Sequence, residues 1–127
     1  MTENVPIFLS YADADEGWAR QVKAELESRS VEWLRPPLSA GDDWVETMVA
    51  AMNRSRHVVI IVTPEAVHSP RVAFELGAAL ALKKEVIPVV FPGTPSERIP
   101  GPLKLRKWIE KREPRAVAAD VARRIAA

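Results

Sequence analysis

The sequence of 127 residues contains no cysteine, which excludes disulfide bonds and metal sites built on thiolates. It also lacks a strong charge of either sign, because 18 lysines and arginines nearly balance 17 aspartates and glutamates, for a net charge of +1. No apolar run is long enough to cross a bilayer, and no basic segment precedes the first apolar run as in a signal peptide. These absences predict a cytoplasmic domain that binds neither nucleic acid nor membrane.

Several motifs that carry familiar chemistry are missing as well. Neither a GxGxxG nor a GxxxxGK[ST] loop is present to cradle phosphates. The two histidines, His57 and His68, lack the spacing of metal ligands, and neither is an obvious triad partner for Ser10. A phospho-receiver domain needs an aspartate at the end of its third strand, where this chain has Thr63. We therefore expect no metal and no bound cofactor.

What the chain does contain is an alternation of strand-like and helical segments. Apolar, β-rich runs occupy residues 5–11, 31–34, 57–63, 85–91 and 105–110. Helical apolar stripes lie between them, and residues 92–102 read as an irregular loop. Strands that alternate with helices predict a parallel sheet covered on both faces. We predict one α/β domain over residues 1–127, a flavodoxin-like three-layer sandwich with five parallel strands in the order 2-1-3-4-5.

The stretch SPRVAFELGAALAL, from Ser69 to Leu82, raises the main functional question. Ser69 followed by Pro70 is typical of a helix start, and Glu75 is then the single carboxylate among small and apolar residues. In a sheet of this order, ligands bind beyond the carboxyl ends of the first and third strands, and Glu75 follows the loop after the third. Glu75 is therefore either a site carboxylate or an ordinary helix glutamate paired with Arg71 at i−4.

Taken in order, the motifs resemble those of the Toll/interleukin-1 receptor (TIR) domain family. IFLSYADAD resembles the first strand and its loop, and LSAGDDWVETMVAAMNRSRHVVIIVTPEAVHSP resembles the segment from the mobile loop to the serine before the third helix. FELGAALALKKEVIPVV resembles the third helix and the fourth strand, and KWIE fits the fifth strand. The resemblance covers nearly the whole chain, and the Gly-Asp-Asp-Trp and ELGAALA variants are similar to bacterial members.

The resemblance implies two functions, in bacterial immune or stress signalling. TIR domains assemble with one another, so other TIR domains are expected partners. A subset cleaves NAD⁺ at the nicotinamide–ribose bond with a glutamate of the third helix, and Glu75 matches that glutamate by its position after His-Ser-Pro. NAD⁺ or a related dinucleotide would be a substrate and not a cofactor. A lone carboxylate suffices, because nicotinamide leaves without protonation and the transition state resembles an oxocarbenium ion.

The resemblance also suggests substrate-binding roles for Ser10, Tyr11, Asp13, Arg35, Ser39, Gly41, Trp44, Ser69 and Arg71. Several of them have a structural alternative. Asp13 or Asp15 would cap the first helix, Ser39 and Gly41 would serve a turn, and Trp44 falls in an apolar helical stripe. The two arginines would meet phosphates or be solvated.

Two positions depart from the family pattern, and two other functions stay open. Arg71 stands where many family enzymes carry an aromatic residue, and Arg35 stands where an acidic residue is common. Arg71 therefore removes a stacking surface and adds a cation near the reacting ribose. The first alternative is a non-catalytic TIR scaffold in which Glu75 is structural. The second is a nucleoside deoxyribosyltransferase-like enzyme, which would act on free nucleosides.

Overall fold

The computed structural model describes residues 5–38 and 43–127, and its centre is one parallel sheet. The strands are β1 (Ile7–Ser10), β2 (Trp33–Leu34), β3 (His57–Val62), β4 (Glu85–Val90) and β5 (Ile109–Glu110). Their order is β2-β1-β3-β4-β5, and every neighbouring pair is parallel. The predicted five-stranded, flavodoxin-like sheet is confirmed.

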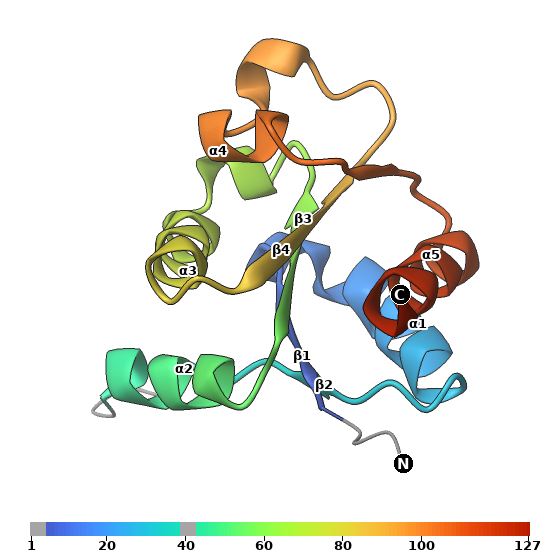
Figure 1. The fold of residues 1–127 in the computed structure, drawn as a ribbon. Helices are drawn as coiled ribbons and strands as arrows, with labels where there is room; N and C mark the ends of the chain where they lie inside the picture. The colour runs from blue at the N-terminus through green and yellow to red at the C-terminus, as the bar shows by residue number, and fades with distance from the viewer. Residues whose placement is uncertain (1–4, 39–42) are drawn as a thin grey trace.

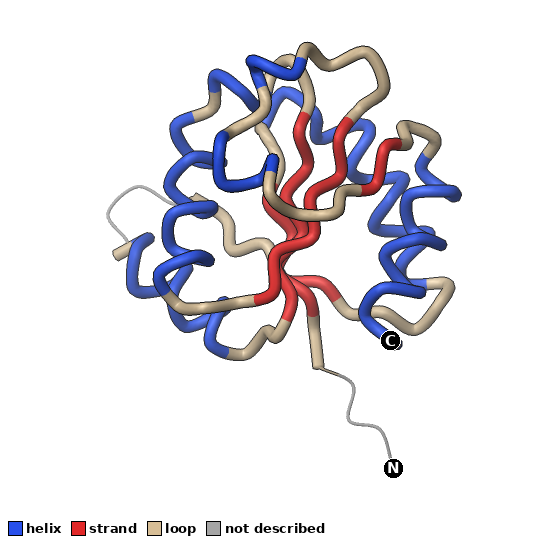
Figure 2. Tube along the Cα trace, turned by 45° about the horizontal axis from the view of Figure 1, so that its top comes forward, coloured by secondary structure: helices blue, strands red, loops and turns tan. Residues whose placement is uncertain are grey.

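Helices cover both faces of this sheet, as Figures 1 and 2 show. They are α1 (Glu16–Glu27), α2 (Trp44–Asn53), α3 (Pro70–Ala81), α4 (Gly101–Lys104) and α5 (Pro114–Ala126). Helices α1 and α5 lie on one side, whereas α2, α3 and α4 lie on the other. None of the helices in the described ranges is long and apolar enough to cross a membrane.

Strand β3 is buried on both faces of the sheet. All six of its residues are buried, as its continuous β-branched run predicts. Val58, Ile60 and Val62 pack into the core on the α2/α3 side. Val59 and Ile61 pack into the second core on the α1/α5 side. Because successive side chains point to opposite faces, one apolar run fills both cores.

The edge strands are shorter than the sequence predicts. Strand β2 begins at Trp33, because Ser30 adopts a left-handed backbone with φ of 60° and the chain only then turns into the sheet. Strand β5 begins at Ile109. Leu105 and Arg106 belong instead to the turn that ends α4, in which the Arg106 amide donates to the Leu103 carbonyl (3.1 Å).

The expectation of an irregular loop over residues 92–102 is also wrong in part. A short 3-10 helix spans Ser96–Arg98, and α4 begins at Gly101. Leu103 lies fully inside the α2/α3-side core and fixes the loop, whereas Leu105 is 92% exposed. Prolines at both ends of the segment hid these helical turns from a pattern-based prediction.

Candidate functional site

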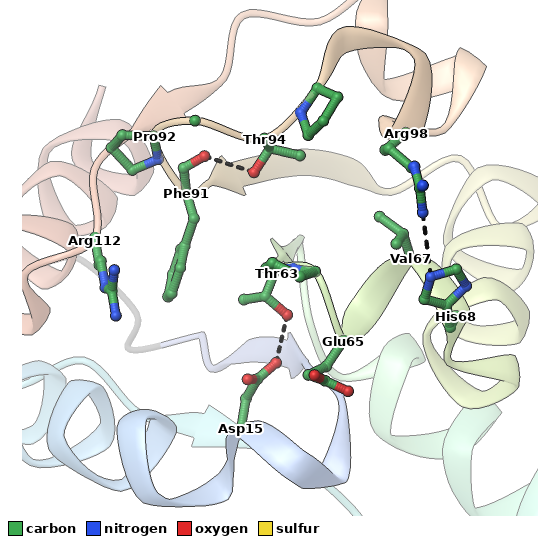
Figure 3. A pocket seen from close by; sticks show the side chains of 13 residues that line it. Asp15, Thr63, Glu65, Val67, His68, Phe91, Pro92, Thr94, Arg98 and Arg112 are labelled. Atoms are coloured by element: carbon green, nitrogen blue, oxygen red, sulfur yellow. Dashed lines mark hydrogen bonds between the residues drawn. The ribbon is translucent and has the colours of Figure 1, made fainter.

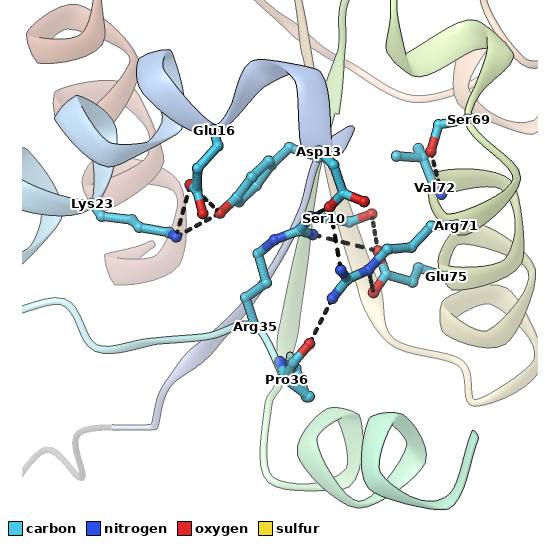
Figure 4. A network of polar contacts seen from close by, with 11 residues as sticks. Ser10, Asp13, Glu16, Lys23, Arg35, Pro36, Ser69, Arg71, Val72 and Glu75 are labelled. Atoms are coloured by element: carbon cyan, nitrogen blue, oxygen red, sulfur yellow. Dashed lines mark hydrogen bonds and ion pairs between the residues drawn. The ribbon is translucent and has the colours of Figure 1, made fainter. Parts of the chain in front are cut away.

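Glu75 is fully buried, in the second turn of α3 beside the end of β1. Helix α3 begins where the sequence predicts, because the Ser69 hydroxyl accepts a hydrogen bond from the Val72 amide (3.2 Å). This start directs Glu75 toward the sheet. The Ser10 hydroxyl, on the last residue of β1, donates to Glu75 Oε1 (2.7 Å). Figure 4 shows this carboxylate at the centre of a polar network.

Two arginines lie over the Glu75 carboxylate. Arg71, one turn earlier on α3, places Nε 3.4 Å from Glu75 Oε2. Arg35, which follows β2, places a guanidinium nitrogen 4.0 Å from Oε1. Their side chains are only 11% and 6% exposed, so the alternative that either arginine is solvated is wrong. The predicted i−4 contact between Arg71 and Glu75 is present, but it is buried.

Asp13 and a backbone carbonyl hold the two arginines in place. Asp13 Oδ1 lies 2.8 Å from Arg35 and 3.4 Å from Arg71. Arg71 also donates to the carbonyl of Pro36 (2.6 Å). Asp13 and Asp15 make no side-chain cap at the start of α1, contrary to the capping alternative. Asp15 instead accepts a hydrogen bond from Thr63 (2.6 Å).

The aromatic ring of Tyr11 packs against the guanidinium of Arg35. The Arg35 guanidinium lies 3.5 Å from the centroid of the Tyr11 ring, which is a close cation–π contact. The Tyr11 hydroxyl donates to Glu16 (2.7 Å) and accepts from Lys23 (2.5 Å). Burial, and then the hydrogen bond to Glu16, raise the pKa of Tyr11, which keeps the phenol protonated. Tyr11 therefore positions Arg35 in this structure.

Two buried donors in this region have no hydrogen-bond partner within the part of the chain that the structure describes. One is the Arg35 nitrogen that faces Glu75, and the other is the indole Nε1 of Trp44. The Trp44 ring is half-buried, packs on Phe74 at 5.2 Å and lies 5.8 Å from the Arg71 guanidinium. Trp44 thus packs as the apolar stripe predicts, and its ring also borders the arginine cluster.

The charges in the cluster balance, yet burial still raises the pKa of the Glu75 carboxyl. Asp13 and Glu75 face Arg35 and Arg71, two charges of each sign. Burial raises the pKa of Glu75, because removal from water penalises the carboxylate. The Ser10 hydrogen bond and the two arginines oppose that rise without cancelling it. A raised pKa of this kind is common at functional carboxylates.

The structure gathers five of the predicted residues around Glu75: Ser10, Tyr11, Asp13, Arg35 and Arg71. Ser69 acts as the helix cap, and Ser39 and Gly41 lie outside the described residues. The Pro36 carbonyl was missed, and a backbone acceptor leaves no signal in a sequence. Within residues 5–38 and 43–127, no cluster of three histidine or acidic side chains is placed to hold a metal.

Figure 3 shows an open cavity whose lining includes none of the residues of this cluster. It has a volume of about 450 Å³, and its wall comes from the loops after β3 and β4, with Thr63, Phe91, Arg98 and Arg112 among its lining residues. Glu75 does not line it. The crevice expected between β1 and β3 is thus filled at Glu75 by Arg35 and Arg71.

Solved structures with the same fold come from several proteins. A metazoan TIR-STING receptor from C. gigas is 22% identical with a TM-score of 0.79, and the match covers all of this chain and 42% of the receptor. The TIR domain of a Toll-related receptor from Hydra magnipapillata is 18% identical with a TM-score of 0.75, covering 95% and 98% of the two chains. A Clostridium botulinum CMP N-glycosidase is 15% identical with a TM-score of 0.68, covering 92% and 97%.

Family membership is decided by the sequence itself. No curated protein matches the chain. The family model described as "TIR domain" matches residues 7–125, which includes every strand and almost all of the last helix. The chain therefore belongs to the TIR domain family.

Proposed function

We propose that this TIR domain cleaves NAD⁺ at the nicotinamide–ribose bond and that Glu75 is its catalytic carboxylate. The observation that carries the proposal is a fully buried glutamate, aligned by Ser10 at the carboxyl end of β1, with two cations covering it. Buried ion clusters can often be replaced as a whole by apolar side chains without loss of stability, so the fold alone does not require this one.

The chemistry requires little from the protein besides this carboxylate. The bond between ribose C1′ and the pyridinium nitrogen breaks, and its electron pair leaves with nicotinamide, which becomes neutral. The ribose carries the positive charge that develops, and an ionised Glu75 stabilises it. Water then adds its oxygen to C1′ and releases one proton. The products are nicotinamide, ADP-ribose and a proton.

Structural relatives support a reaction of this class. The Clostridium botulinum relative is described as a CMP N-glycosidase, and cleavage of CMP and of NAD⁺ both break a bond between ribose C1′ and a base nitrogen. Another relative, with a TM-score of 0.60, is described as the TIR domains of the activated Roq1 resistosome. By analogy, we propose that this domain acts when several copies associate, in bacterial immune or stress signalling.

A non-catalytic scaffold is the second candidate, because the arginines leave Glu75 no exposed surface. The test is direct detection of nicotinamide released from NAD⁺ by the concentrated protein, with Glu75→Ala alongside. We expect release by the wild type and loss of at least about 100-fold in the variant, the usual effect of removing one transition-state stabiliser. Absence of release from both, even from protein tethered at high density, would favour the scaffold.

A further inference from the structure

The arginine pair over Glu75 sets a condition on any reaction at that carboxylate. Arg71 Nε lies 3.4 Å from Oε2 and an Arg35 nitrogen lies 4.0 Å from Oε1, so a ribose cannot contact either oxygen while both arginines stay. A cation would also repel the positive charge that develops on the ribose. Both guanidinium groups must therefore leave the carboxylate before the bond breaks.

Separation from Glu75 would leave two buried cations with a single carboxylate. Arg35 and Arg71 are 6% and 11% exposed, and their remaining acidic partner, Asp13, is 73% exposed. A buried charge that loses its partner is strongly unfavourable. A substrate that carries an anion beside the reacting ribose would supply the missing partner, whereas a neutral nucleoside would not.

The unpaired nitrogen of Arg35 points independently to a ligand. This nitrogen is buried, faces Glu75 and has no hydrogen-bond acceptor among residues 5–38 and 43–127. Buried donors are nearly always paired, so a missing acceptor requires an explanation. The planar fork of a guanidinium matches the oxygens of a phosphate group better than any other common anion except a carboxylate.

We infer that Arg35 and Arg71 bind the 5′-phosphate of the ribose whose N-glycosidic bond is cleaved, and that this phosphate replaces Glu75 as their partner. The inference rests on the proposed function and narrows its substrates to 5′-phosphorylated N-ribosides, both mononucleotides and dinucleotides. The phosphate takes no part in the covalent step. It lies one ribose ring away from C1′, so the arginines move from the carboxylate by about the width of the sugar that takes their place.

Nicotinamide mononucleotide and nicotinamide riboside provide the test, because they share the reacting bond and differ only in the 5′-phosphate. We expect wild-type kcat/KM for the mononucleotide to exceed that for the riboside by at least about 100-fold, which corresponds to about 2.7 kcal/mol. Equal rates, within threefold, would overturn the inference and leave the N-glycosidase function standing.

Arginine variants test whether the preference for the 5′-phosphorylated substrate arises at the arginine pair. Arg71→Ala should lower kcat/KM for the mononucleotide by at least about tenfold more than it lowers kcat/KM for the riboside, because only the mononucleotide carries the phosphate that Arg71 would bind. Arg71→Lys keeps the positive charge but loses the planar guanidinium. Its kcat/KM for the mononucleotide should fall between those of the wild type and Arg71→Ala. Arg98→Ala is the matched control, since Arg98 is exposed and contacts His68 in the neighbouring cavity. Equal losses on both substrates in Arg71→Ala would contradict the inference.

A binding measurement separates this inference from the proposed function. Ribose 5-phosphate should bind the wild-type protein in isothermal titration calorimetry, and ribose should bind at least about tenfold more weakly. Glu75→Gln should bind ribose 5-phosphate more tightly, because its arginines lose a competing partner, and Arg71→Ala should lose binding. If wild type and Arg71→Ala bind the two sugars alike, the inference fails, whether or not NAD⁺ is cleaved.

Discussion

Arg71 and Glu75 lie one turn apart on α3, and their side chains meet at 3.4 Å in a buried cluster. On a helix surface such a pair would contribute only about 0.2–0.5 kcal/mol. Here the pair is enclosed with Arg35 and Asp13, and removal of one member would strand a buried charge. The same contact therefore holds the cluster together and helps to close the carboxylate to solvent.

Ser10→Ala is expected to move the acid limb of the pH–rate profile to higher pH. The Ser10 hydroxyl donates to Glu75 and lowers the pKa of that carboxyl, so its loss raises the pKa further. Because the reaction needs ionised Glu75, activity should then appear only at higher pH. The measurement is kcat/KM for NAD⁺ between pH 4 and 9.

Ser55→Ala is the control for that experiment. Ser55 is also buried and donates to the Ala51 carbonyl (3.0 Å), away from the cluster. Both substitutions should cost about 1–3 kcal/mol of unfolding free energy, but only Ser10→Ala should shift the acid limb. An identical shift in both variants, or in neither, would speak against the role of Ser10.

Glu75→Gln should gain stability relative to the wild type as the pH rises above about 4.5. Burial raises the pKa of Glu75 in the folded state, so the folded protein binds this proton more tightly than the unfolded chain does. This contribution to stability is fully present below the unfolded pKa and is lost as the pH rises through the folded pKa. Glutamine stays neutral and loses nothing over that window.

Urea unfolding of both proteins at a series of pH values measures this difference. The difference between the two free energies of unfolding cancels other titrating groups, including His57, whose pKa burial lowers. If the free energy of unfolding of the wild type instead rises relative to that of Glu75→Gln over the same pH range, the arginines lower the pKa of this carboxyl by more than burial raises it.

Specific activity should rise with protein concentration. Under the proposed function several copies of this domain act together, so a higher concentration should favour the active assembly. A dilution series for nicotinamide release, with light scattering on the same samples, checks this. Constant activity per molecule across a wide range would show that one copy is sufficient.

Leu103→Ala and Leu105→Ala test the corrected fold of the segment before β5. Leu103 is 0% exposed and packs in the core, whereas Leu105 is 92% exposed two residues later. The first change should cost about 2–5 kcal/mol, and the second less than about 0.5 kcal/mol. Thermal or urea unfolding distinguishes them. Equal costs would contradict the placement of α4.

Sequence patterns predicted the parts of the fold that depend on local chemistry. The run from His57 to Val62 marked β3 as doubly buried, and Ser69-Pro70 marked the start of α3. The first signal is strong because six consecutive residues carry it. The second is strong because it depends on one specific hydrogen bond, from the Val72 amide to the Ser69 hydroxyl. The edge strands and α4 involve two to four residues each, too few for periodicity to appear.

The site itself was predicted by position and not by contact. Glu75, Ser10 and Arg71 were identified, but the closure of the carboxylate by Arg35 was not. Arg35 comes from the loop after β2 and meets Glu75 only because β1 and β3 are neighbours in the sheet. Asp13 likewise looked like a helix cap, because its salt bridges depend on two arginines from distant segments.

The most direct test of the account is the rate of nicotinamide release by Glu75→Gln, measured together with its stability at pH 7. The account predicts a rate at least about 100-fold below wild type in a protein that is still folded at pH 7, as its urea unfolding transition shows. That result would assign the buried carboxylate to chemistry. A variant that keeps the wild-type rate, or that loses activity only because it unfolds, would contradict the account and leave Glu75 a structural residue.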